Sequence, residues 1–230
     1  MINYFKQHKW KILISSLVTL TPIIAGLILW DKLPDLVPSH WNVNGEVDGW
    51  VSKPVFVFVI PLLMVALNLL ASVATAVDPK NANNSGKPLI LVYAVIPALA
   101  IALSTVTYCA ALGVDVPIGN LLMVILGVLF LFIGNYLPKC KQSYTIGIKI
   151  MWTLDSDKNW VATHRLAGKV WVGGAVLMLL SAFLPMNLIF WVSFPIVLAM
   201  VIVPIVYSYL YYKNHKSEDG YLDKKEENHE

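Results

Sequence analysis

Histidine and carboxylate side chains are the groups in this chain that could carry out chemistry, and they occur together at two places. His40 and Asp48 share one polar stretch, and His164 follows Asp155 and Asp157 in another. A histidine oriented by a carboxylate can act as a general base, and the same groups can bind a metal ion. Neither place has a nucleophile motif or a third ligand at metal-site spacing. We therefore expect no catalytic residue, metal or cofactor, and keep an enzyme with His164 as general base as an alternative.

The composition places these groups in a membrane protein. Hydrophobic residues make up 57% of the 230 residues and charged residues only 13%, whereas soluble domains carry about a quarter charged residues. Mean hydropathy is +0.67. A helix needs about 20 apolar residues to cross a bilayer. Six stretches reach that length: 12–30, 54–77, 88–112, 117–137, 167–186 and 188–210. The sequence thus predicts an all-α, polytopic membrane helix bundle with six transmembrane helices.

The distribution of basic residues predicts the orientation. If the six stretches cross alternately, Lys32 and Lys53 are the only two of the 17 Lys and Arg residues on one face. By the positive-inside rule the other face is cytoplasmic, which places both termini inside. The first stretch is expected to be an uncleaved signal anchor, and 213–230 a disordered cytoplasmic tail. A net charge of +3 without a basic face argues against direct nucleic-acid binding, and two cysteines are expected to be free thiols.

The stretches themselves carry almost no charge. Lys169 is the only charged residue within them, and it lies near an end. Ion-coupled transporters usually place a titratable or charged group inside the bundle, so that class is disfavoured. Asn68 and the threonines of these stretches are expected to hydrogen-bond a neighbouring helix or their own backbone. A small-molecule or lipid transporter remains an alternative function.

The outer loop, residues 31–53, is one of two segments long enough to hold a site. Asn44-Gly45 lies between short apolar stretches and predicts a hairpin with a type I′ turn. The loop has more carboxylates than lysines and contains two tryptophans that would lie at the lipid headgroups. Such a surface suits a cationic or amphipathic peptide, although it could also simply cover the bundle. The candidate residues are His40, Trp41, Asn42, Glu46, Asp48 and Trp50.

The inner loop, residues 138–166, is too aromatic for a simple linker. Asp155 or Ser156 can cap a helix that continues into the fifth stretch. Trp160, His164 and Gly168 then share one face of that helix, with the indole stacked on the imidazole. His164 and the adjacent Arg165 would bind either lipid or a partner at the inner interface.

The inner loop carries a set of motifs that resembles a known family. The motifs are Gly134-Asn135, Gly147-Ile148, Trp152-Thr153-Leu154, and Trp160 with Thr163-His164-Arg165 and Gly168. On these residues the segment resembles the SdpI family, bacterial immunity proteins against a secreted peptide toxin of the SdpC type. The outer-loop run from Leu33-Pro34 through His40, Gly45, Asp48-Gly49 and Trp50 resembles the domain of unknown function that often precedes this module. Lys149 stands where the family usually has arginine, which replaces a bidentate contact with a point charge.

The resemblance implies a multi-pass protein of the bacterial cell membrane. Its function would be toxin immunity, with signalling by tethering a cytoplasmic repressor as an additional role. The implied partners are the toxin, the lipid bilayer and that repressor. The implied domains are residues 1–112, with the outer loop, and 113–212, with the inner loop. The implied cytoplasmic site comprises Asn135, Gly147, Lys149, Trp152, Thr153, Trp160, Thr163, His164, Arg165 and Gly168.

Overall fold

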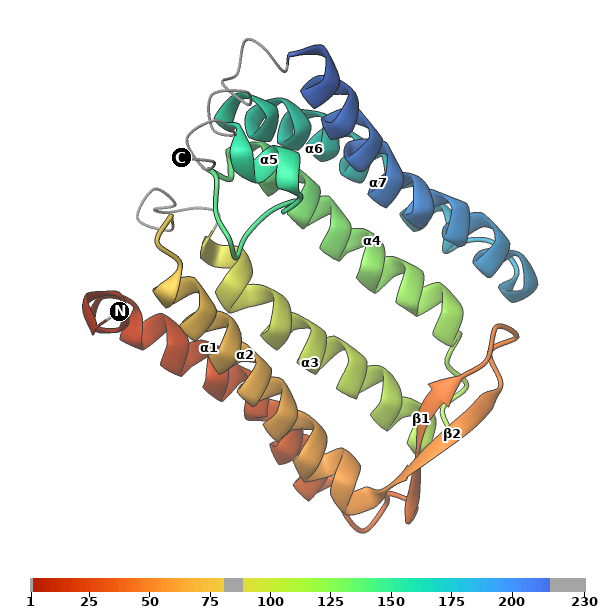
Figure 1. Cartoon of the computed structure of the whole chain (residues 1–230). Coiled ribbons are helices and arrows are strands. Elements are labelled where there is room, and N and C mark those ends of the chain that lie inside the picture. Colours follow the sequence, from red (N-terminus) through yellow and green to blue (C-terminus); the bar gives the residue numbers. More distant parts are fainter. Residues whose placement is uncertain (1, 81–88, 216–230) are drawn as a thin grey trace.

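The structure is a computed structural model that describes residues 2–80 and 89–215. Long helices lie side by side, and a short hairpin lies at one end of them (Figure 1). The all-α membrane bundle is therefore confirmed. In chain order the elements are α1 (Ile2–Ile28), β1 (Leu36–Trp41), β2 (Val47–Ser52), the π-helix η1 (Val55–Val59), α2 (Ile60–Val77), α3 (Leu89–Ala111), α4 (Ile118–Tyr136), the 3₁₀ turn η3 (Leu137–Lys139), α5 (Met151–Asp155), α6 (Asp157–Ser181) and α7 (Met186–Asn214). Most of the expected tail, residues 216–230, lies outside the described residues.

Five helices in the described residues are long and apolar enough to cross a membrane. They are Tyr4–Ile28, Val55–Val77, Leu89–Ala111, Ile118–Lys139 and Met186–Asn214. The expected stretch 167–186 corresponds to α6, whose first half carries Lys158, Arg165 and Lys169 and which is therefore less apolar. Its 25 residues extend about 37 Å at 1.5 Å per residue, and it packs along α4 and α7. The count of six crossings and the cytoplasmic termini stay predictions.

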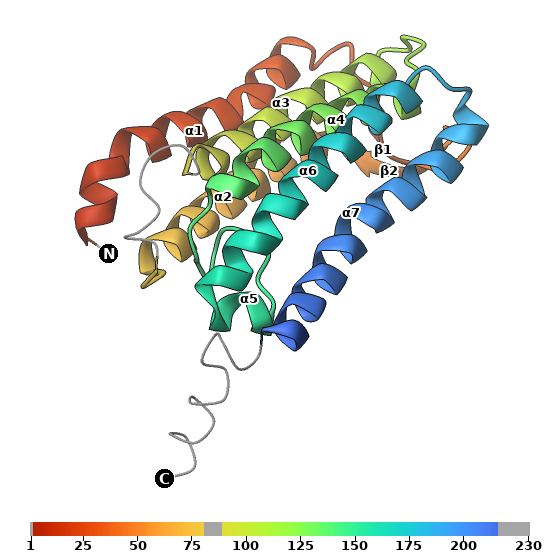
Figure 2. The same ribbon diagram turned by 90° about the horizontal axis from the view of Figure 1, so that it is seen from above.

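The helices form two groups of three. Helices α1, α2 and α3 pack on one another, as do α4, α6 and α7, and α3 meets α4 between the groups (Figure 2). Within the second group α4 and α6 approach closely at two glycines. A Cβ on Gly134 would lie 2.9 Å from the Val172 nitrogen, and one on Gly168 would lie 2.9 Å from the Gly134 oxygen. The proposed division at residue 112 stays a prediction.

Polar side chains inside the first group bond either a neighbouring helix or, as Thr19 does to the Ser15 carbonyl, their own helix, as expected. The Asn68 amide on α2 donates to the Ser15 hydroxyl on α1 at 2.8 Å, and both side chains are buried. Further along, the Tyr108 hydroxyl on α3 donates to the Pro22 carbonyl on α1 at 2.9 Å, which joins α3 to α1. These bonds hold α1, α2 and α3 together beneath the outer loop.

The outer loop forms the expected hairpin, but its turn is not type I′. Strands β1 and β2 pair antiparallel, and the Gly45 N–H donates to the Asn42 carbonyl at 2.9 Å. Type I′ needs positive φ at both central residues, whereas only Gly45, at φ +84°, has it here. The Asn42 N–H also donates to the Glu46 carbonyl. The loop is thus a three-residue connection with glycine in the left-handed position, which spares Asn44 from that conformation.

The last inter-helix turn also differs from the expected one. The sequence placed it at residues 186 and 187, but α6 ends at Ser181 and α7 begins at Met186. Pro185 explains the shift, because a proline disfavours the helical conformation of the residue before it and readily starts a helix after it. Asn120 on α4 stabilises the turn by donating to the carbonyls of Ala182 and Leu184 at 2.7 and 3.1 Å.

The hairpin lies at one end of the bundle, and the inner loop, residues 138–166, lies at the opposite end (Figure 1). We call these residues the inner segment from here on. This arrangement predicts opposite labelling by a membrane-impermeant maleimide. Val43→Cys at the hairpin tip should react in intact cells, whereas Met151→Cys should react only after permeabilisation; the native side chains are 57% and 72% exposed. The wild-type chain, with Cys109 and Cys140, gives the background. Labelling of both variants in intact cells would contradict the orientation.

Candidate functional site

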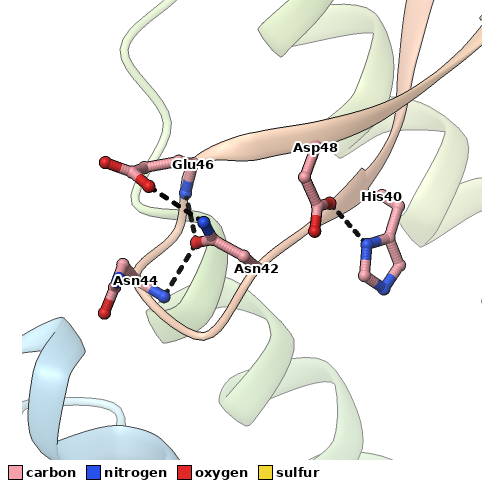
Figure 3. Close-up of polar contacts among 5 residues, drawn as sticks. All are labelled: His40, Asn42, Asn44, Glu46 and Asp48. Atoms are coloured by element: carbon pink, nitrogen blue, oxygen red, sulfur yellow. Dashed lines mark hydrogen bonds and ion pairs between the residues drawn. The ribbon is translucent and has the colours of Figure 1, made fainter.

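The outer hairpin carries polar side chains on its exposed surface. The Asp48 carboxylate accepts a hydrogen bond from His40 Nδ1 at 2.5 Å, and both side chains are largely exposed (Figure 3). The Asn42 side chain instead holds the turn together. Its oxygen accepts from the backbone of Asn44 and Glu46 at 2.9 and 3.0 Å, and its amide donates to the Glu46 carboxylate at 2.9 Å (Figure 3). The carboxylates of Glu46 and Asp48 remain open to solvent.

An apolar base fixes the hairpin to the helices. Val37 is fully buried in a cluster with Leu33, Phe56, Val57 and Tyr108, which joins β1 to η1 and α3. At the edge of the cluster, Lys53 donates to the Trp30 carbonyl at 3.2 Å. Trp50, in contrast, is 53% exposed, and Trp41 is half-buried. The hairpin therefore presents an exposed indole and two carboxylates on a rigid support.

His164 lies at the centre of the inner segment and is almost fully buried. Its Nδ1 bonds the Trp160 carbonyl at 2.8 Å, and its Nε2 accepts from the Ile148 N–H at 2.9 Å. This pattern requires a neutral ring that donates from Nδ1. Burial lowers the pKa of His164 to about 4, although its bond to the Trp160 carbonyl acts in the opposite direction. Both nitrogens are occupied by backbone groups, which does not suit a general base.

Trp160 and Gly147 enclose the imidazole. The indole stacks on it with ring centres 4.0 Å apart, as expected, and donates to the Cys140 carbonyl at 2.8 Å. Gly147, at φ +111°, lies against edge atoms of both rings: a Cβ there would be 2.5 Å from His164 Nε2 and 2.7 Å from Trp160 Cζ2. Only glycine combines that backbone conformation with so little space. The motif residues Gly147, Trp160 and His164 therefore form one structural unit.

Two buried threonines of the motif also have structural partners. Thr153 donates to the Ile148 carbonyl at 2.8 Å and accepts from the Ile150 N–H at 3.1 Å, which ties α5 to the preceding loop. Thr163 donates to Asn159 Oδ1 at 2.9 Å. Asn159, which the sequence analysis did not select, also accepts from the Ser208 hydroxyl at 2.9 Å and so joins α6 to α7.

The remaining residues selected from the sequence lie at the start of α6, against α7 or on the surface. Ser156 caps α6 by accepting from the Asn159 N–H at 3.1 Å, as predicted. Trp152 lies against α7, with its ring centre 5.2 Å from that of Tyr209. Lys149 is exposed and donates to the Thr145 carbonyl at 3.2 Å. Asn135 and Arg165 lie on the surface.

Asp78, at the end of α2, was missed by the sequence analysis, and its carboxylate accepts five hydrogen bonds. One oxygen, Oδ2, accepts from the Ser143 hydroxyl at 2.6 Å, the Thr145 hydroxyl at 2.9 Å, and the N–H groups of Tyr144 and Thr145 at 2.9 and 3.1 Å. The other accepts from the Lys80 N–H at 2.9 Å. Burial raises the pKa of this carboxyl, but the hydrogen bonds outweigh burial and lower it overall.

Lys80 and Gln142 extend this connection. The Lys80 ammonium bonds the Gln142 side-chain oxygen, and the Gln142 amide donates to the carbonyls of Thr153 and Leu154 at 2.8 and 2.9 Å. We call the bonds of Asp78 and Lys80 to residues 142–154 the inner clasp. The inner clasp joins the first helix group to the inner segment of the second. Local sequence gave no sign of it, because its partners are more than 60 residues apart.

The buried neutral state of His164 predicts a pH dependence. Since folding lowers its pKa from about 6.5 to about 4, the inner segment is most stable above pH 6.5 and loses stability as the pH falls from 6.5 toward 4. The full loss is on the order of 3 kcal/mol. His164→Gln should lose this dependence and His40→Gln, at an exposed position, should keep it. Thermal unfolding midpoints in detergent at pH 7.5, 5.5 and 4.5 measure the effect; an unchanged pH dependence in His164→Gln would contradict it.

Comparison with known proteins matches both parts of the chain. Residues 139–208 match the SdpI/YfhL protein family, and residues 17–65 match a domain of unknown function, DUF1648. The chain is also 27% identical over 203 residues to the immunity protein SdpI of Bacillus subtilis (strain 168), which covers 88% of this chain and 96% of that protein. No solved structure gives a significant match. The DUF1648 match contains the hairpin, and the SdpI/YfhL match contains His164 and its enclosing residues. The chain is thus a multi-pass membrane protein in which a segment similar to the SdpI/YfhL family follows a segment similar to DUF1648.

Proposed function

We propose that this chain is an immunity protein of the bacterial cell membrane that protects against a secreted peptide toxin. The observation that carries the proposal is the similarity to an immunity protein over 88% of the chain, which includes both the hairpin and the inner segment. A non-catalytic role fits the inner segment, where both nitrogens of His164 bond backbone groups. Protection would thus depend on binding.

The outer hairpin is the surface that we assign to the toxin. Glu46 and Asp48 present negative charge, and the Trp50 indole offers a large rigid apolar surface that costs little entropy to order. A cationic or amphipathic peptide matches both properties. Because Val37 and its cluster anchor the hairpin, such a peptide would meet a surface that is largely organised before binding.

A continuous path leads from the hairpin to the inner segment. Strand β2 ends at Ser52, η1 and α2 follow without a long loop, and α2 ends at Val77, directly before Asp78. A shift of the hairpin on toxin binding would therefore move one rigid helix whose far end holds the inner clasp. Toxin must bind the shifted arrangement more tightly than the resting one for this to occur. A cytoplasmic repressor would then bind the inner segment that this shift exposes.

Replacement of the exposed indole tests the toxin surface. Trp50→Ala should lower the concentration of purified SdpC-type toxin that halves survival by about thirtyfold, because a central interface tryptophan contributes on the order of 2 kcal/mol. Survival of a sensitive bacterium expressing each variant is the measurement, with abundance checked in membranes. Trp10→Ala is the matched control, since Trp10 is 64% exposed in the first half of α1, away from the end of α1 that leads to the hairpin. Absence of protection by the wild-type chain, or equal loss in both variants, would contradict the proposal.

Removal of one charge tests the connection. Asp78→Asn replaces an oxygen acceptor with an amide that faces two N–H donors, so residues 142–154 should exchange amide hydrogens at least tenfold faster. In the wild-type chain toxin should also speed exchange there, and in Asp78→Asn it should add nothing.

The matched control for this experiment is Asp115→Asn. Asp115 is an exposed carboxylate in the turn between α3 and α4, outside the inner clasp. Hydrogen exchange in this variant should follow the wild-type chain with and without toxin. If Asp78→Asn shows wild-type exchange and a wild-type response to toxin, the inner clasp does not transmit binding.

A further inference from the structure

A groove between α4 and α6 opens near the inner end of the second helix group. Its volume is about 350 Å³, and its lining includes Asn135 and Pro138 from α4 and η3, and Arg165 and Lys169 from α6. Gly134 and Gly168 form its floor, where the two backbones approach too closely for a Cβ. This groove is separate from the enclosed His164 and from the inner clasp.

The lining changes from polar to apolar along the groove. On α6 the residues are Arg165, Lys169 and then Val172, spaced so that all three share one helix face. Arg165 lies closest to the start of α6 and Val172 lies farther into the bundle. A ligand that fits this gradient has an anionic end at Arg165 and an apolar end beside Val172.

The cationic groups of the groove have no partner among the residues that the structure describes. Across residues 2–80 and 89–215, neither Arg165 nor Lys169 makes a hydrogen bond or an ion pair, and no carboxylate lines the groove. Arg165 is also the only arginine of the 230 residues, beside 16 lysines. Guanidinium differs from ammonium in binding a phosphate through two parallel N–H bonds. Arg165 therefore lies in an exposed groove where its guanidinium can bind a phosphate through two N–H groups.

We propose that this groove binds the phosphate of an anionic phospholipid. The Arg165 guanidinium donates two hydrogen bonds to the phosphate oxygens, Lys169 adds a point charge, and the Asn135 amide donates from the facing helix. The acyl chains then lie along Val172 and the exposed apolar surface beyond it. The lipid would join α4 to α6 at the level where the charged part of α6 enters the apolar bundle.

Lipid titration of the purified full chain in neutral detergent tests the proposal. The probes are phosphatidylglycerol, phosphatidylcholine and inorganic phosphate, and native mass spectrometry counts the molecules retained. The wild-type chain should retain one phosphatidylglycerol, bind phosphatidylcholine at least tenfold more weakly and retain no inorganic phosphate. Arg165→Ala and Arg165→Lys should each weaken phosphatidylglycerol binding about tenfold, and Lys169→Ala by a smaller factor.

Lys213→Ala is the matched control, because Lys213 is an exposed lysine near the end of α7 on the same side of the bundle. It should bind phosphatidylglycerol as the wild-type chain does. Arg165→Lys keeps the charge and guards against misfolding of the alanine variant, and size-exclusion profiles verify the fold of each. Equal binding by Arg165→Lys and the wild-type chain, equal loss in Lys213→Ala, or inorganic phosphate binding as tight as the lipid would overturn the proposal. This assay measures lipid binding on the purified chain, so its result does not depend on whether the chain protects bacteria against toxin.

Discussion

The carboxylate of Asp78 is the interaction on which the arrangement of the two helix groups most depends. Between the groups α3 contacts α4, Ile146 packs against a cluster on α1 and α3, and Asp78 accepts four hydrogen bonds from residues 143–145 of the other group. A carboxylate with several donors is stabilised as a charge, which is why the pKa of Asp78 is lowered despite burial. The loop that Asp78 binds continues to Ile148, whose N–H donates to His164. The first group thus fixes the geometry of the second at this end.

Burial of polar groups gives the inner segment a single conformation. Thr153, Asn159, Thr163 and His164 are all buried, and each has a named partner. A buried polar group without a partner costs about 1–3 kcal/mol, so competing arrangements that break these bonds are disfavoured. The same bonds connect the segment to α7 through Ser208. If toxin binding shifts α2 as proposed, an inner segment of this kind would respond as a unit, because one broken bond exposes several others.

The sequence predicted the local features well and the long-range contacts poorly. The helix bundle followed from apolar length, the hairpin from Asn44-Gly45, and the stack of Trp160 on His164 from helical spacing. The turn type was wrong, because the sequence did not indicate that Asn44 would keep a negative φ in a three-residue loop. Asp78 was missed because helix packing, which no local pattern records, sets its distance from Ser143. Both family matches fall on the segments with local motifs.

The motif residues divide into two sets with different physical roles. Gly147, Trp160 and His164 are enclosed, so replacing them changes the fold of the inner segment before it changes any contact outside the chain. Asn135 and Arg165 are exposed, and within the described part of the chain no internal bond accounts for their side chains. Loss of function at an enclosed residue therefore says little about partners. An exposed residue that lines a groove and lacks an internal partner is the better guide to what this protein binds at its inner end.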